Sequence, residues 1–131
     1  MDNAVAALFT DLAERGLLET TLVVLCGEFS RTPRMNDGGN GGPAGSMGTP
    51  GRDHWGNSMF CLLGGGGVKG GQVVGSTDRL GTQPRTRPLV PANVHATIYQ
   101  VLGIDPNLQL TDPTGRPIPV LDDPTPIQEL L

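Results

Sequence analysis

The chain has 131 residues, the length of one domain, and a formal net charge of −4 at pH 7. This acidic balance argues against a nucleic-acid-binding protein, which would carry a basic face. No apolar run reaches the roughly 18 residues that a membrane span needs, so we expect no membrane-spanning segment.

The composition predicts a loop-rich chain with little material for a core. Hydrophobic residues make up 37% and aromatic residues 4% of the sequence, which is low for a domain that must bury its own core. The 20 glycines and 12 prolines amount to about twice the average usage. We therefore expect residues 1–131 to be a single but partial domain, whose loops need a further scaffold.

The first predicted elements are a helix and a buried strand. Residues 3–15 are predicted to be an amphipathic helix, because apolar residues from Val5 to Leu12 recur at helical spacing. The continuous apolar run at residues 20–26 is typical of a strand in a parallel sheet covered on both faces. Helix and strand together are half of a βαβ unit, so the sequence predicts that its first strand precedes Met1.

The middle of the chain is predicted to be a long loop of the active-site type. Residues 30–57 are polar and rich in glycine, and long loops in compact domains are usually functional or disordered. A second apolar strand is predicted at residues 58–63, and a short strand near residues 72–74.

A second helix and an irregular tail complete the prediction. Residues 91–102 have helical periodicity, with Pro91 at the first helical position. Residues 104–131 are predicted to be a proline-rich tail. Within it, residues 117–121 are a candidate edge strand, where missing donors are tolerated.

The two cysteines, Cys26 and Cys61, both lie in the predicted apolar strands. We interpret them as small buried hydrophobic residues. Two thiols do not make a disulfide framework, and they do not identify a redox compartment.

Glu28 is the first candidate site residue, because it follows the C-terminal end of the predicted strand at residues 20–26. Ligands of open α/β sheets bind outside such strand ends, and a carboxylate there suits a divalent cation. Arg31 offers a planar fork for phosphate or sulfate oxygens. The alternative is that Glu28 and Arg31 form an ion pair at a strand–loop junction.

The second candidate cluster is the segment Gly-Arg-Asp-His-Trp-Gly at residues 51–56. The neutral imidazole of His54 is a common metal ligand, and Asp53 either binds the metal or orients the ring. The alternative is a loop anchored by Trp55 with solvated charges around it. His95, on the predicted second helix, is interpreted as structural rather than as a ligand.

The order of these motifs resembles a bacterial sulfatase-like family of unassigned function, a domain-of-unknown-function family placed in the alkaline phosphatase superfamily. The resemblance covers essentially the whole chain. It is carried by Gly-Glu-Phe-Ser-Arg-Thr-Pro at 27–33, Gly-Arg-Asp-His-Trp-Gly-Asn-Ser at 51–58, Gly-Gly-Gly-Val-Lys-Gly-Gly at 65–71, Ala-Thr-Ile-Tyr at 96–99, Leu-Gly-Ile-Asp at 102–105 and Gly-Arg-Pro at 115–117.

The resemblance implies an α/β fold: the C-terminal portion of an alkaline-phosphatase-like, mostly parallel sheet flanked by helices, with long Gly/Pro-rich loops. It implies a metal-dependent hydrolase of sulfate or phosphate esters. Glu28 and His54, with Asp53 as a weaker candidate, would bind a divalent ion such as zinc, manganese, magnesium or calcium. Arg31 and Arg52 would hold the anionic ester.

The resemblance also implies what this chain lacks. The nucleophile belongs to the N-terminal half of the fold, so no catalytic residue is predicted in this chain, and we expect little turnover from it alone. Many members carry export signals, which suggests a periplasmic or surface location for the parent; the chain itself does not indicate one.

Two residues depart from the family pattern. Phe29 stands where a second metal ligand would be, and Val90 stands where a capping threonine is expected before the second helix, a change that costs about 1 kcal/mol. The competing interpretation is therefore a non-catalytic binding or scaffold protein that retains the alkaline-phosphatase-like fold.

Overall fold

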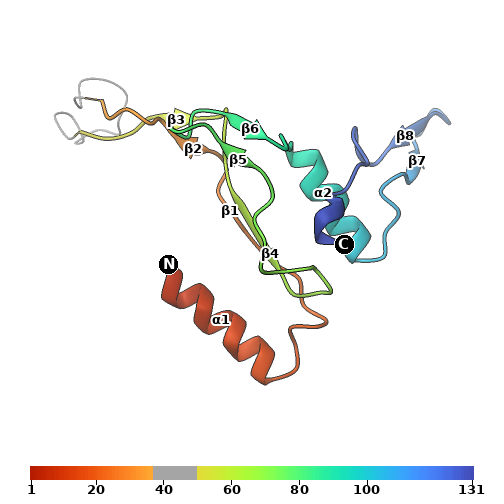
Figure 1. Cartoon of the computed structure of the whole chain (residues 1–131). Helices are drawn as coiled ribbons and strands as arrows, with labels where there is room; N and C mark the ends of the chain where they lie inside the picture. Colours follow the sequence, from red (N-terminus) through yellow and green to blue (C-terminus); the bar gives the residue numbers. More distant parts are fainter. Residues whose placement is uncertain (37–49) are drawn as a thin grey trace. The chain divides into compact units, whose positions relative to one another are not determined.

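The computed structural model describes residues 1–36 and 50–131 (Figure 1). The described residues form two α-helices, eight short strands and one 3-10 helix. In chain order these are α1 (Asp2–Glu14), β1 (Val23–Cys26), β2 (Ser30–Arg31), β3 (His54–Trp55), β4 (Cys61–Gly64), β5 (Ser76–Thr77), β6 (Pro84–Thr86), α2 (Pro91–Val101), β7 (Gln109–Thr111), β8 (Pro117–Pro119) and η1 (Gln128–Leu130). Neither helix is long and apolar enough, within these residues, to cross a bilayer.

The chain divides into two compact units. The first unit contains Met1–Val24, Leu62–Gln72 and Leu89–Leu131. The second unit contains Leu25–Cys61 and Val73–Pro88. The candidate metal and anion residues of the sequence, from Glu28 to His54, all belong to the second unit.

The predicted parallel sheet is wrong. The eight strands pair as β1–β4, β2–β3, β5–β6 and β7–β8, in four separate two-stranded antiparallel sheets. The described chain therefore does not form an alkaline-phosphatase-like sheet flanked by helices. An apolar run carries no information about strand direction, and each of these strands, two to four residues long, pairs with one partner instead of joining a wide sheet.

The strand residues themselves were predicted only in part. β1 and β4 fall within or beside the predicted apolar runs, but β1 is half-buried and exposed in alternation, not covered on both faces. Cys26 is exposed and Cys61 is half-buried, so the interpretation of Cys26 as a buried residue is wrong. No strand forms at residues 72–74, where the Val73 side chain is 92% exposed.

The first helix forms where the periodicity predicts it. α1 spans Asp2–Glu14 against the expected 3–15, and Gly16 follows with a φ of +68° that favours glycine. No residue of α1 is buried, although Phe9 is half-buried. A Cβ on Gly64 of β4 would lie 2.6 Å from the Phe9 ring, so this contact requires glycine at position 64.

The second helix is also confirmed, and the Asn93 side chain, which was not predicted as a cap, binds the backbone at its start. α2 begins at Pro91, and the Asn93 side-chain oxygen accepts a hydrogen bond from the Val90 backbone N–H at 2.9 Å. This is one half of a capping box. Val90 has no side-chain oxygen for the other half, so the absence of threonine there is offset only in part.

Polar contacts between α2 and the tail organise the small core of the first unit. The buried hydrophobic residues of the described chain are Ala96, Ile127 and Leu130. Thr97 is 0% exposed; its hydroxyl donates to the Asn93 carbonyl at 2.7 Å and accepts from the Ile127 N–H at 2.8 Å. One hydroxyl thus joins the middle of the helix to the end of the chain.

Two side chains, Asn93 and Gln72, hold the tail by further hydrogen bonds. The Asn93 amide donates to the Asp123 carboxylate at 2.9 Å and to the Thr125 carbonyl at 3.0 Å. The Gln72 amide donates to the carbonyls of Lys69 and Glu129, at 2.9 and 2.7 Å. The tail therefore has defined partners although it is rich in proline.

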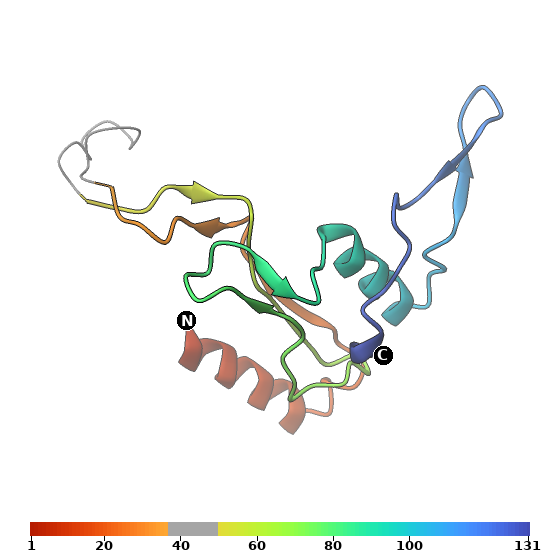
Figure 2. The same ribbon diagram turned by 45° about the horizontal axis from the view of Figure 1, so that its top comes forward.

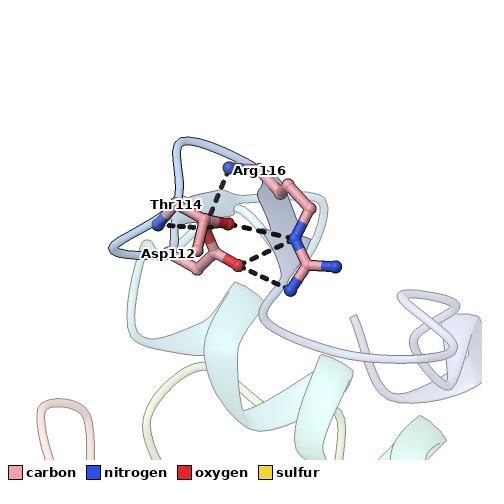
Figure 3. A network of polar contacts seen from close by, with 3 residues as sticks. All are labelled: Asp112, Thr114 and Arg116. Carbon is pink, nitrogen blue, oxygen red and sulfur yellow. Dashed lines mark hydrogen bonds and ion pairs between the residues drawn. The ribbon is translucent and has the colours of Figure 1, made fainter.

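The predicted edge strand is confirmed in position as β8, which pairs with β7 through Gln109↔Pro119, Leu110↔Ile118 and Thr111↔Pro117. The turn between them is built on Asp112 (Figure 3). Its carboxylate accepts hydrogen bonds from the Thr114 hydroxyl at 2.6 Å and from the Arg116 N–H at 2.9 Å, and pairs with the Arg116 guanidinium at 3.0 Å. These donors, the Thr114 hydroxyl above all, lower the pKa of Asp112 to about 2.

Replacing Thr97 by valine tests the core contact. The substitution keeps the shape but leaves the buried Ile127 N–H without its acceptor, which should lower the free energy of unfolding by about 1–3 kcal/mol. The measurement is urea denaturation of the 131-residue chain. Thr111→Val, on the exposed strand β7, is the matched control and should change stability by less than about 0.5 kcal/mol. Equal effects of the two substitutions would contradict the assignment.

The low pKa of Asp112 gives a pH prediction. The folded-state pKa lies below the unfolded value of about 3.9, so this carboxylate contributes stability above about pH 4 and loses it as the pH falls through about 2. Thr114→Val removes the hydroxyl donor and should raise the pKa of Asp112 toward its ordinary value. Carbon-detected NMR titration of the carboxyl measures it, with Thr111→Val as control. An unchanged midpoint in Thr114→Val would refute the assigned cause.

Candidate functional site

The pairing of β2 with β3 brings the two candidate motifs of the sequence side by side (Figure 2). Ser30 faces Trp55 and Arg31 faces His54 in an antiparallel register. Backbone hydrogen bonds extend the pairing on both sides, from the Thr32 N–H to the Asp53 carbonyl at 2.9 Å and from the Ser30 N–H to the Ser58 carbonyl at 3.0 Å. Both strands lie within the region predicted as a loop at residues 30–57, of which residues 37–49 lie outside the described residues.

Trp55 and Ser58 anchor this pair of strands to a turn in the same unit. The Trp55 indole N–H donates to the Thr82 carbonyl at 2.6 Å, and the Ser58 hydroxyl donates to the Gly81 carbonyl at 2.9 Å. The Asp78 carboxylate accepts hydrogen bonds from the Thr82 hydroxyl and backbone N–H, which lower the pKa of Asp78. The alternative prediction of a loop anchored by Trp55 is therefore confirmed for the indole.

A cleft of about 430 Å³ lies beside the paired strands in the second unit. Three charged side chains line it: Glu28, Arg31 and Arg52. The rest of its lining is Gly27, Phe29, Ser30, Met59 and Phe60. The structure thus brings together three of the five predicted site residues, drawn from the two separate motifs.

Arg31 is positioned by its own neighbourhood and not by Glu28. Its guanidinium donates to the Ser30 carbonyl at 3.2 Å and lies 5.5 Å from the centre of the Phe29 ring. The described residues show no ion pair between Glu28 and Arg31, so the predicted alternative of a structural ion pair is not found. Both charged groups are exposed and able to meet a ligand.

His54 and Asp53 do not line the cleft. His54 is exposed on β3, and its ring lies 4.5 Å from the Phe29 ring with an interplanar angle of 51°. Asp53 accepts a hydrogen bond from the Asn36 amide at 2.8 Å. The carboxylate of Asp53 therefore has a structural partner. His54 contacts Phe29, which lines the cleft together with Glu28 and Arg31.

The described side chains do not assemble a complete metal centre. Residues 1–36 and 50–131 contain no group of three or more His, Cys, Asp or Glu side chains that could hold a metal ion. Glu28 and His54 offer one donor each. Because a hydrolytic metal centre usually has at least three protein ligands, these two residues do not make one by themselves.

The sequence did not point to the apolar part of the cleft. Met59 and Phe60 were assigned to the predicted apolar strand at residues 58–63, but they precede β4 and are 42% and 62% exposed. Phe29 was noted only as a departure from a ligand pattern. The exposure of Met59 and Phe60 is the feature that indicates an apolar binding surface. This exposure can be recognised only when the first residue of β4 is known.

The chain belongs to the DUF1501 family of proteins of unknown function, whose family model matches residues 1–131. No curated protein and no solved structure matches the chain. The family description names no activity, so the sulfatase-like resemblance stays a prediction.

Proposed function

We propose that the cleft formed by Glu28, Arg31 and Arg52 binds the anionic head of an organic sulfate or phosphate ester. The observation that carries the proposal is the meeting of two arginines from separate motifs in one cleft. A guanidinium presents its donors in a rigid fork that matches phosphate and sulfate oxygens.

The charge balance of the cleft supports an anionic ligand. Two guanidinium groups face one carboxylate there, which leaves one net positive charge in a chain whose overall charge is −4. Neither Arg31 nor Arg52 forms an ion pair with another described residue. The two cations are therefore not neutralised within the described chain, and an oxyanion would gain their charge-assisted hydrogen bonds.

The apolar lining supports an organic group attached to the anion. Phe29, Met59 and Phe60 face the same cleft as the arginines. Covering exposed apolar surface stabilises a complex by about 25 cal/mol for each Å² removed from water. An aromatic or alkyl ester would use both the charged and the apolar surfaces, whereas inorganic sulfate would use only the charged one.

The proposal extends to a sulfatase-like, metal-dependent hydrolase as the parent activity. Glu28 and His54 are proposed as metal ligands, and a divalent ion at such a site would neutralise charge on the ester oxygens. The described residues supply only part of the ligand set of a metal ion. We propose that the chain contributes anion binding to the parent activity and does not contribute the nucleophile. The sulfatase-like resemblance of the motifs supports this extension.

A second candidate function is a non-catalytic binding protein. The contact between the Phe29 and His54 rings favours it, because an imidazole packed on an aromatic ring has lost part of its freedom to turn toward a cation. Hydrolysis of aryl sulfates and aryl phosphates with added zinc, manganese, magnesium or calcium separates the two, when measured on a full-length homologue. Turnover there would exclude the non-catalytic alternative, and ester binding without turnover would favour it.

Replacing either cleft arginine by glutamine should weaken binding of an aryl sulfate by about ten- to a hundredfold. Each substitution removes a charged hydrogen bond of about 1.5–3 kcal/mol. The measurement is isothermal titration of the 131-residue chain with 4-nitrophenyl sulfate and 4-nitrophenyl phosphate. The matched control is Arg85→Gln, on the exposed strand β6 of the same unit. Equal affinities of Arg31→Gln, Arg52→Gln and Arg85→Gln would contradict the proposal.

The metal assignment has its own test. If Glu28 and His54 bind a divalent cation, Glu28→Gln and His54→Gln should each weaken its binding by at least about tenfold. The measurement is calorimetric titration with zinc and with manganese, and Glu19→Gln and His95→Gln are controls at exposed positions. Unchanged affinity in both Glu28→Gln and His54→Gln would end the ligand assignment and leave anion binding intact.

A further inference from the structure

Cys26 and Cys61 lie at the same end of two paired antiparallel strands. Cys26 is the last residue of β1 and Cys61 is the first residue of β4, and β1 and β4 are hydrogen-bonded neighbours. Both residues belong to the second unit. The two side chains are in hydrogen-bonding contact, which places the sulfur atoms next to each other.

Antiparallel strands provide the spacing that a disulfide needs. Facing residues on such strands have Cα atoms about 4.5–5.5 Å apart, which lies within the ~4.4–6.8 Å that a disulfide bridges. A bond between the two sulfur atoms would therefore require little movement of the backbone. The two cysteines are also the only ones in the chain, so no other intramolecular pairing competes.

The two thiols differ in exposure, which gives them different roles in an exchange reaction. Cys26 is exposed and Cys61 is half-buried. Burial, with a smaller effect of Cys26, raises the pKa of Cys61. The accessible Cys26 is the group that an external disulfide can reach, and Cys61 is placed to attack the product.

We propose that Cys26 and Cys61 are a redox-active dithiol that forms a reversible disulfide by exchange with low-molecular-weight disulfides such as oxidised glutathione. The inference does not depend on the ester-binding function. It uses only the placement of the two side chains on β1 and β4.

The exchange balances in two steps. The Cys26 thiolate attacks one sulfur of oxidised glutathione, so the glutathione S–S bond breaks, a Cys26–glutathione bond forms and one glutathione thiolate leaves. The Cys61 thiolate then attacks the Cys26 sulfur and expels the second glutathione thiolate. The two cysteines are oxidised, one glutathione disulfide is reduced, and the two cysteine protons end on the two glutathione thiols.

The test is equilibration of the 131-residue chain in buffers of graded glutathione redox ratio, followed by acid quenching, maleimide labelling and intact-mass measurement. The wild-type chain should become two hydrogens lighter and lose both reactive thiols. Its equilibrium constant for disulfide formation should be at least about tenfold larger in native buffer than in guanidinium, because the fold holds the thiols together. Cys26→Ser and Cys61→Ser should each stop at one glutathione adduct.

Three results would overturn the proposal. The first is an equal equilibrium constant in native buffer and in guanidinium, which would mean that the fold contributes nothing. The second is a glutathione adduct on both cysteines of the wild-type chain with no internal disulfide. The third is a disulfide that joins two copies of the chain.

Discussion

The antiparallel pairing of β2 with β3 is the constraint on which the candidate site depends. Each strand has only two residues, so the register Ser30↔Trp55 and Arg31↔His54 is held mainly from outside the ladder. The Trp55 indole provides that support by its hydrogen bond to the Thr82 carbonyl. A shift of one residue would turn Arg31 to the opposite face and remove it from the cleft that it shares with Arg52.

Hydrogen bonds between side chains and the backbone hold the segments of this chain together, a role that an apolar core has in larger domains. The described chain buries few hydrophobic residues, and its segments meet through groups such as the Thr97 hydroxyl, the Asn93 amide and the Asp112 carboxylate. Such contacts are directional, so they define loops that apolar packing would leave unspecified. The anion-binding cleft follows the same rule, since its arginines are placed by strand pairing and not by burial.

The sequence predicted the two helices because apolar spacing is a local property, and both helices lie within a residue or two of the expected bounds. It did not predict the sheets, because an apolar run such as residues 20–26 names neither its partner nor its direction. Glu28 and Arg31 were predicted from residue chemistry and Arg52 from the family resemblance, and the three share a cleft. Met59 and Phe60 were missed because strand and loop residues have the same composition there.

Backbone NMR of the 131-residue chain tests the central claim that this cleft recognises an organic oxyanion. Titration with 4-nitrophenyl sulfate should shift the amide signals of residues 27–31, Arg52, Met59 and Phe60, which belong to the cleft lining or flank it. The same titration with uncharged 4-nitrophenyl methyl ether should shift these signals far less, because this compound has no anionic group to accept hydrogen bonds from the two arginines. Equal shifts with both compounds, or shifts confined to other segments, would contradict the account.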